Sequence, residues 1–319
     1  MNNLQSVIST LNFYPNRNPK LRFFALWYFT ILLSLWTIAG HVFLGFEQSY
    51  AHPLSGVAAA CAAQFLLEWV DARSHGRAPR YTGSLTNLLH FLPPAIIPGL
   101  ACAMLIYPNE RLSPVIFAAV LSIASKVVLR APIGEGKTQH IFNPSNLGIT
   151  ITLLCLPSVG LAPPYQFTEN VTGIANWIIP GIILATGIFM HAKFTGRLPL
   201  VLAWLTGFAL QGLTRAAVFG IPWRVPFVPM TSAAFILFTL YMIPDPATTP
   251  LAPRRQVLFG LAIAALYGML FVLHVVFGLF IALASVSLCR GIGLYLGNLL
   301  RRPELEPAMT RVAVAPSMR

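Results

Sequence analysis

The chain has 319 residues, of which 56% are hydrophobic and only 9% are charged, and its formal net charge is +12. This much apolar surface exceeds what one soluble core can bury, so the composition excludes a soluble protein and predicts an all-α protein that crosses a lipid bilayer several times. The basic residues stand in short clusters between apolar runs, as the positive-inside rule describes, so we expect no nucleic-acid partner.

The first half of the chain contains five apolar runs. Residues 1–22 are polar, lack the apolar core of a signal peptide, and are expected to form a cytoplasmic N-terminal segment. Prolines 93, 94 and 98 interrupt the third run, which should be kinked or broken where neighbouring helices satisfy the freed carbonyls. The fifth run is too short to cross a bilayer alone. The five predicted membrane helices are Phe23–Leu44, Pro53–Val70, Leu85–Tyr107, Leu112–Leu129 and Ile149–Pro157.

Charged side chains flank these runs at their cytoplasmic ends. Glu68 and Asp71 are expected to be solvated or paired with Arg73, since they stand at a helix end. Lys126 and Arg130 lie four residues apart on one helical face, where they could neutralise a phosphate. The interpretation that we favour is that both extend their charged ends toward the interface.

The polar segment from Gly136 to Gly148, which runs into the short fifth helix, is the strongest candidate for a site. Pro144 disfavours a helical backbone conformation at Asn143, and Ser145 and Asn146 can cap a helix that begins immediately afterwards. A broken element at membrane depth survives where it is buried in protein or lines a cavity, and its free N–H groups can bind an anionic or polar ligand. The alternative is a capped, short membrane helix with a polar connector.

The second half contains five more runs, which brings the prediction to about ten transmembrane helices. An outside loop, Ser158–Val171, precedes them, and the eighth run leads into the segment Pro244–Pro250. Residues 301–319 are expected to form a basic cytoplasmic tail that lies near anionic lipid or acts as a docking peptide. The five runs are Thr172–Met190, Leu198–Leu213, Phe227–Ile243, Val257–Leu273 and Val275–Leu296.

The basic residues also predict the orientation. With a cytoplasmic N-terminus, 18 of the 21 Lys and Arg residues lie on the cytoplasmic side, and only Arg111, Arg215 and Arg224 lie outside. Both termini are therefore predicted to be cytoplasmic, in a bacterial inner membrane. An odd number of spans per half is what an inverted repeat requires, so we expect a 5+5 repeat made of residues 23–171 and 172–300. Arg215 and Arg224 are candidates for a specific contact with an anion or a partner on the outside.

Two motifs together carry a resemblance to a known family. His140-Ile141-Phe142-Asn143-Pro144 precedes a short helix, and Tyr241-Met242-Ile243-Pro244-Asp245-Pro246-Ala247-Thr248-Thr249-Pro250 ends a later one. In this order they resemble the NqrB/RnfD family, which comprises membrane subunits of the Rnf electron-transport complex and of the sodium-pumping NADH:quinone oxidoreductase, and relatives encoded with enediyne biosynthesis genes. The resemblance implies an inverted repeat shaped like urea-transporter-like channels, which holds flavin as a redox carrier and works with redox partner proteins.

The chain departs from that family in its outside loop. Respiratory members attach FMN through a phosphoester to the threonine of a Ser-Gly/Ala-Ala-Thr motif, whereas residues 165–172 here read YQFTENVT. Because this motif is absent, any flavin, FMN or riboflavin, is expected to bind noncovalently. Thr168 and Thr172 are the hydroxyls that lie near the corresponding place in the loop. The candidate cofactor-binding residues are Lys137, His140, Asn143, Ser145, Asn146, Asp245, Thr248, Thr249 and Thr168.

Asp245, between two prolines, has two interpretations. It can act as a structural clamp that meets Lys137, Lys193 or Arg197, or it can contact a ligand directly. No metal site is expected, because the histidines show no matched pair for haem and the four cysteines show no C-x-x-C spacing.

Two function classes therefore compete, and the sequence leaves open whether the chain is an enzyme. The first is an electron-transfer membrane subunit that binds flavin. The second is a channel or transporter for a small polar solute with a urea-transporter-like fold.

Overall fold

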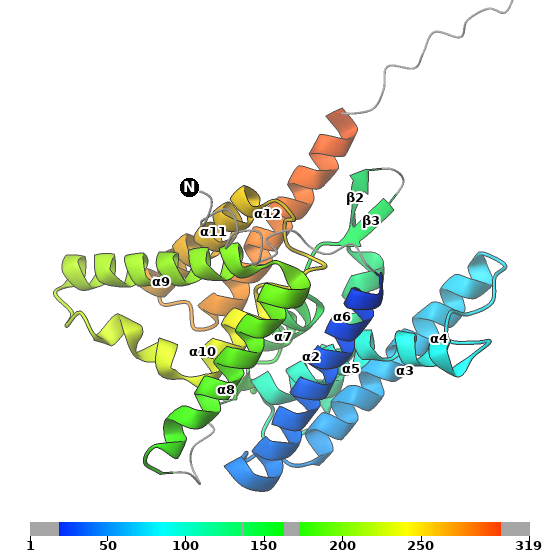
Figure 1. The fold of residues 1–319 in the computed structure, drawn as a ribbon, viewed down its shortest axis with the longest axis horizontal. Coiled ribbons are helices and arrows are strands. Elements are labelled where there is room, and N and C mark those ends of the chain that lie inside the picture. The colour runs from blue at the N-terminus through cyan, green and yellow to red at the C-terminus, as the bar shows by residue number, and fades with distance from the viewer. Residues whose placement is uncertain (1–18, 135–136, 163–171, 301–319) are drawn as a thin grey trace, which may run out of the picture.

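The computed structural model describes residues 19–134, 137–162 and 172–300, and helices make up most of these residues (Figure 1). The helices of the first half are α2 (Pro19–Ala39), α3 (Ala51–Ser74), α4 (Leu85–Phe91), α5 (Pro93–Leu105), α6 (Ser113–Val128) and α7 (Pro144–Cys155). Those of the second half are α8 (Ala175–Met190), α9 (Leu198–Phe219), α10 (Ala233–Leu237), α11 (Pro253–Val272) and α12 (Gly278–Leu300).

Shorter elements join these helices. Three π-helical turns, η1 (Gly40–Leu44), η2 (His191–Thr195) and η4 (Phe238–Met242), extend α2, α8 and α10, and η3 (Val225–Thr231) is a 3-10 helix. Two small antiparallel pairings complete the described part of the chain. One joins β1 (Ile106–Tyr107) to β4 (Gly160–Leu161), and the other joins β2 (Arg130–Gly134) to β3 (Lys137–His140).

Seven of the described helical segments are long and apolar enough to cross a membrane, which confirms an all-α, multi-pass membrane protein. They are Phe23–Leu44, Ala51–Ser74, Leu85–Leu105, Asn176–Thr195, Leu198–Phe219, Pro253–Val272 and Gly278–Leu300. Helices α6 and α7 are apolar but shorter. The predicted eighth span, Phe227–Ile243, is wrong as a continuous helix, because η3, α10 and η4 divide it. The ten-span count and the 5+5 repeat remain predictions.

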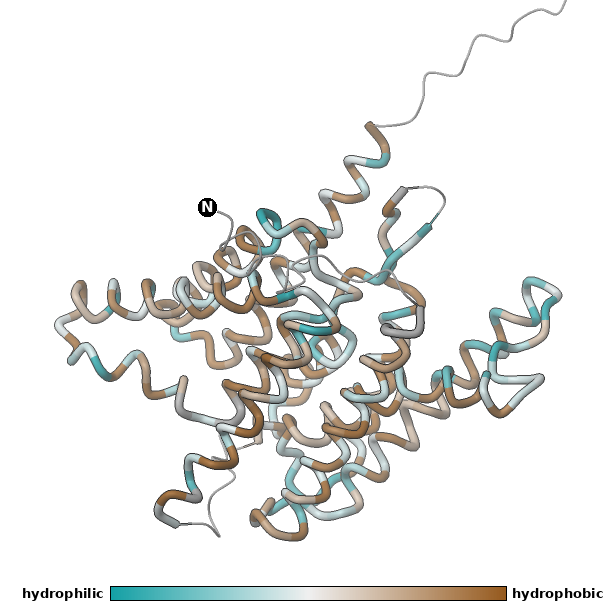
Figure 2. Tube along the Cα trace, in the orientation of Figure 1, coloured by the Kyte–Doolittle hydropathy of each residue, from teal (hydrophilic) through white to brown (hydrophobic). Residues whose placement is uncertain are grey.

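Large apolar side chains cover the outer surface of these helices, which suits contact with the lipid bilayer. Leu54, Trp177 and Leu258 are each about 70% exposed, at 71%, 72% and 69%. In Figure 2, apolar residues line the helices, whereas hydrophilic ones gather at the α3–α4 connection and at the β2–β3 hairpin. The α3–α4 connection and the β2–β3 hairpin are therefore two polar parts of the surface.

The predicted interruption of the third span is confirmed. Leu92 alone separates α4 from α5, whose first two residues are Pro93 and Pro94, and carbonyls near this point accept hydrogen bonds from neighbouring helices. Gln64 donates to the carbonyl of Phe91, and Lys126 Nζ donates to the carbonyl of Pro94 at 2.9 Å. The interpretation of Lys126 as a side chain that extends to the interface is therefore wrong, since its ammonium group is used inside the protein.

The acidic end of α3 also differs from expectation. Glu68 is buried, and it accepts a hydrogen bond from Arg77 Nη1 at 2.6 Å and lies 3.2 Å from Arg80 Nε. Arg77 also bonds Asp71. The predicted pairing with Arg73 is wrong, because the chain turns back after α3 and brings the later arginines over both carboxylates.

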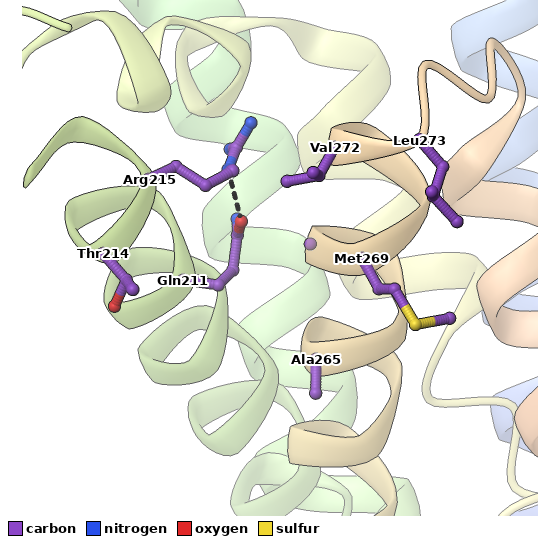
Figure 3. A pocket seen from close by; sticks show the side chains of 8 residues that line it. Gln211, Thr214, Arg215, Ala265, Met269, Val272 and Leu273 are labelled. Atoms are coloured by element: carbon purple, nitrogen blue, oxygen red, sulfur yellow. Dashed lines mark hydrogen bonds between the residues drawn. The ribbon is translucent and has the colours of Figure 1, made fainter. Parts of the chain in front are cut away.

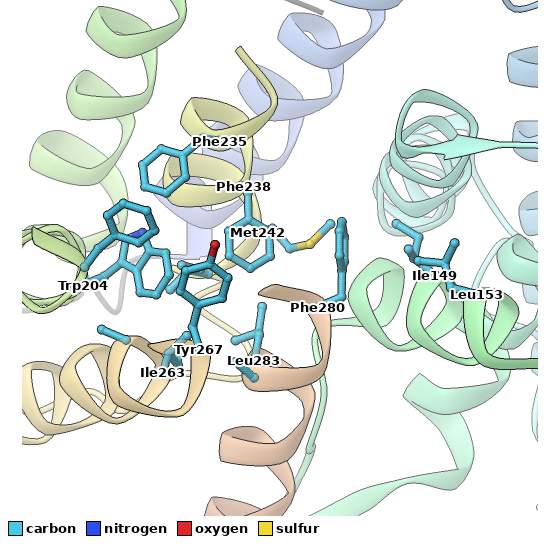
Figure 4. Close-up of a cluster of buried hydrophobic side chains, with 14 of the residues drawn as sticks. Ile149, Leu153, Trp204, Phe235, Phe238, Met242, Ile263, Tyr267, Phe280 and Leu283 are labelled. Carbon is cyan, nitrogen blue, oxygen red and sulfur yellow. The ribbon is translucent and has the colours of Figure 1, made fainter. Parts of the chain in front are cut away.

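An aromatic cluster forms the core of the second half (Figure 4). The rings of Trp204 and Phe208 on α9 pack against Phe235 of α10 and Tyr267 of α11, with centroids between 4.7 and 6.2 Å apart. Gly260 permits this close approach, because a Cβ there would lie 2.7 Å from the carbonyl oxygen of Leu200. The tightly packed pair α9–α11 holds the broken segment α10–η4 in place.

The topology yields a first prediction. The start of α2, the end of α12 and the β2–β3 hairpin all lie toward the same end of the view in Figure 1. We expect reporter fusions at Met1 and Arg319 to read as cytoplasmic, and a fusion in the turn at Asn109 to read as external. External activity at both chain ends would contradict this orientation.

Candidate functional site

The first motif lies where the β2–β3 hairpin leads into α7. The hairpin pairs Arg130 with His140 and Ala131 with Gln139, and Tyr295 of α12 bonds the carbonyl of Arg130. Gly291 fixes the distance to α12, because a Cβ there would lie 2.6 Å from Ile141 Cγ2. The hairpin and the residues that follow it are thus held directly against α12.

Asn143 is the N-cap of α7, so the prediction that Ser145 and Asn146 cap this helix is wrong: the helix begins at Pro144, and both residues lie in its first turn. Its backbone is non-helical, with φ −59° and ψ 124°, and its Oδ1 accepts hydrogen bonds from Asn146 N at 3.1 Å and Ser145 Oγ at 2.9 Å. Pro144 occupies the first helical position, where its missing N–H has no cost. The local sequence Asn-Pro-Ser-Asn therefore accounts for the start of this helix.

The second motif, Pro244–Pro250, is a turn organised by Asp245. Its Oδ1 accepts from Ala247 N at 3.0 Å and its Oδ2 accepts from Thr248 Oγ1 at 3.0 Å. Thr249 Oγ1 donates to the backbone carbonyl of Asp245 at 2.6 Å. The side chains of Asp245, Thr248 and Thr249 are therefore engaged within the turn itself.

The two motifs meet. Asn143 Nδ2 donates to the carbonyl of Met242 at 3.0 Å, and Gln139 donates to the carbonyl of Ala247. His140 Nε2 lies 4.0 Å from Asp245 Oδ2. We call this contact between residues 139–146 and residues 242–249 the clasp. It joins two broken elements from opposite halves of the chain.

Arg197 supports the clasp from the start of α9. It is fully buried, and its guanidinium donates to Thr249 Oγ1 at 2.8 Å, to the carbonyl of Pro246 at 3.1 Å and to that of Thr195 at 3.3 Å. Burial lowers the pKa of Arg197 to about 10. The negative charge of Asp245 opposes this shift, and the positive charge of Arg290 adds to it. Arg197 is thus still protonated at neutral pH. Arg197 is one of the three basic residues predicted to meet Asp245, and it bonds this turn through Thr249 and Pro246.

Positive charge exceeds negative charge around the clasp. Burial lowers the pKa of His140, the carboxylate of Asp245 opposes that effect, and the charges of Lys126 and Arg130 add to it. His140 is therefore mostly neutral at pH 7. Arg290, beside Gly291 on α12, has a buried Nη1 that bonds no acceptor among the described residues. A buried guanidinium N–H without an acceptor is a group that an anion would satisfy.

The other predicted residues take different positions. Asn146 is buried and its Nδ2 donates to the carbonyl of Phe280 on α12 at 3.1 Å, while its Oδ1 has no partner among the residues described. Lys137 is exposed on β3. Thr168 lies outside the described residues. The remaining four, Asn143, Ser145, Thr248 and Thr249, use their polar atoms within the clasp, so they position it.

Three residues of the site were missed by sequence reasoning. Arg290 stands inside the predicted tenth span, and a lone arginine within a membrane helix is the signal that could have identified it. His191 and Trp204 bind the π-helical turn η4: His191 Nε2 lies 2.6 Å from the carbonyl of Leu240, and Trp204 Nε1 donates to Thr239 Oγ1 at 3.0 Å. No sequence signal indicates their partners, because a π turn depends on tertiary contacts.

Neither a cluster of metal ligands nor a match to a known protein helps to identify this site. Within the part of the chain that the structure describes, no group of three or more His, Cys, Asp or Glu side chains is placed to hold a metal ion. No protein-family model matches the chain, and no curated protein matches it.

Proposed function

We propose that this chain is an electron-transfer subunit of the bacterial inner membrane that binds a flavin noncovalently at the clasp. The observation that carries the proposal is Arg290 Nη1, which is buried and bonds no acceptor among the described residues. Arg290 lies beside the clasp, where positive charge exceeds negative charge. The two motifs that form the clasp are the ones that resemble flavin-binding membrane subunits. Redox partner proteins would dock at the polar surface of the β2–β3 hairpin.

The donor set of the clasp fits the phosphate end of FMN. Arg290 would donate hydrogen bonds to a phosphate group, for which the guanidinium geometry is suited, and the buried Arg197 would add positive charge nearby. Neutral His140 can donate or accept one hydrogen bond without adding charge. When bound, the flavin would supply one- and two-electron transfer. The clasp residues described above, Asn143 and Asp245 among them, would keep the two motifs in register.

Purified protein tests the proposal directly. Protein from riboflavin-supplied cells should be yellow, and denaturation should release flavin into solution. Because the outside loop lacks an attachment motif, Thr168→Ala and Thr172→Ala should leave the bound flavin unchanged, and denaturing gels of the wild type should show no fluorescent band. A fluorescent band that either substitution removes would show covalent attachment and contradict noncovalent binding.

A channel or transporter for a small polar solute is the second candidate. The observation that favours it is α7, a half-length helix of 12 residues that buries the polar side chains Thr150 and Thr152. A colourless preparation from riboflavin-supplied cells, together with solute flux in proteoliposomes, would support this function instead.

A further inference from the structure

A groove of about 430 Å³ lies between α9 and α11 (Figure 3), near the end of α9 opposite to Arg197 and the clasp. Its lining includes Gln211 and Arg215 from α9, and Ala265, Met269 and Val272 from α11. The volume falls within the ~300–1,000 Å³ range of small-molecule sites. Apart from Arg215 and its neighbours on α9, the walls are apolar.

Arg215 is held in the groove with part of its guanidinium unused. Its Nε donates to Gln211 Oε1 at 2.8 Å, and its guanidinium carbon lies 3.8 Å from the centre of the Phe271 ring. The residue is 9% exposed, and no acceptor among the described residues bonds its Nη groups. A fixed cation with free donors in an apolar groove is complementary to an anionic group that carries an apolar chain.

Because α9 and α11 are both candidate membrane spans, the position of the groove near their ends corresponds to a lipid headgroup and the upper part of its acyl chain. Arg215 is four residues from the end of α9, about 6 Å along the helix axis, and the exposed Trp223 follows in the next turn as an interfacial aromatic residue. Arg224 stacks on Trp223, with its guanidinium 5.1 Å from the ring centre. From Val272 the lining extends inward to Ala265, about 10 Å deeper into the apolar region.

We propose that this groove binds one anionic phospholipid. Its phosphate bonds the Nη groups of Arg215, and one acyl chain lies against Ala265, Met269 and Val272. Both lining helices are long and apolar enough to span a membrane, and Met269, Val272 and Leu273 are exposed along the groove, so it opens toward lipid. The apolar walls offer nothing to a free hydrophilic anion. The lipid neutralises the buried charge of Arg215, which is costly in a bilayer without a partner.

Native mass spectrometry of the full-length protein in detergent tests the site, with phosphatidylglycerol, phosphatidylcholine or inorganic phosphate added in turn. We expect the wild type to retain one phosphatidylglycerol with about fivefold preference over phosphatidylcholine, the factor typical of one cation near a membrane surface. Arg215→Met should remove the preference. Arg111→Met, which changes an exposed arginine between β1 and α6, should keep it.

A second variant separates lost binding from misfolding. Ala265→Phe fills the deep part of the groove without touching the charge, and it should abolish retention of the bound lipid while the protein keeps its melting temperature. Three results would overturn the proposal: equal retention of both lipids by the wild type, retention by Arg215→Met at the wild-type level, or displacement of phosphatidylglycerol by inorganic phosphate. None of these results bears on flavin binding at the clasp.

Discussion

Arg197→Met is expected to lower the free energy of unfolding by about 3–5 kcal/mol, because three hydrogen bonds of a charged, fully buried side chain are lost together. The acceptors on Pro246, Thr249 and Thr195 would remain buried without a donor. Arg197→Lys should rescue little, since an ammonium group cannot reach three acceptors in the arrangement that the planar guanidinium serves. Denaturant titration in detergent micelles measures the effect.

The matched control is Arg254→Met. Arg254 is exposed at the start of α11, so its replacement should change stability by no more than about 0.5 kcal/mol. If the Arg197 variant were as stable as this control, the hydrogen bonds from Arg197 to the turn at Asp245 would not hold the clasp together.

Gly148→Ala is expected to produce the second large loss. A Cβ at this position would lie 2.2 Å from Ser122 Oγ and 2.3 Å from the carbonyl oxygen of Ala118, so α7 must move away from α6. Overpacking of this kind costs about 1–3 kcal/mol. That cost outweighs the roughly 1 kcal/mol by which alanine favours a helix over glycine.

Gly293→Ala provides the control for this substitution. Gly293 lies in α12 with no described atom within 4 Å of an added Cβ, so alanine there should be neutral or stabilising by up to about 1 kcal/mol. Adding Ser122→Ala to Gly148→Ala should recover only part of the loss, because the carbonyl of Ala118 stays in place. Equal stability of the two glycine variants would show that the α6–α7 contact is looser than the structure describes.

The start of α7 could be predicted to within a few residues, and so could the interruption at Pro93, because both depend on local chemistry. An asparagine before proline caps a helix, and two successive prolines end one, whatever surrounds them. The seventh span, predicted to end at Leu213, is longer in the structure, where α9 continues to Phe219. The extra turns carry Arg215, which bonds Gln211 and lies over the ring of Phe271. Phe271 belongs to α11, so the sequence of α9 alone does not reveal this contact.

The remaining features depend on contacts between distant parts of the chain. The β2–β3 hairpin contains Pro132 and Gly134, which are poor strand residues, and it is stabilised by α12, more than 150 residues later. The π-helical turn η4 ends the eighth predicted span because His191 and Trp204 bind it from other helices. The hydrophobic periodicity of a single segment does not indicate which distant residues it contacts. These parts of the site therefore became known only from the structure.

FMN and riboflavin binding compared on flavin-free protein is the most direct test of the clasp as a flavin site. The two ligands differ only in the phosphate, so tighter binding of FMN measures the contribution of the positive charge near Arg290. We expect FMN to bind at least about tenfold more tightly than riboflavin to the wild type, as one charge-assisted hydrogen-bonded contact would give. Arg290→Met should abolish the difference, whereas Arg111→Met, at an exposed position between β1 and α6, should preserve it. Equal affinity for FMN and riboflavin, or an undiminished preference in the Arg290 variant, would contradict a phosphate site at the clasp.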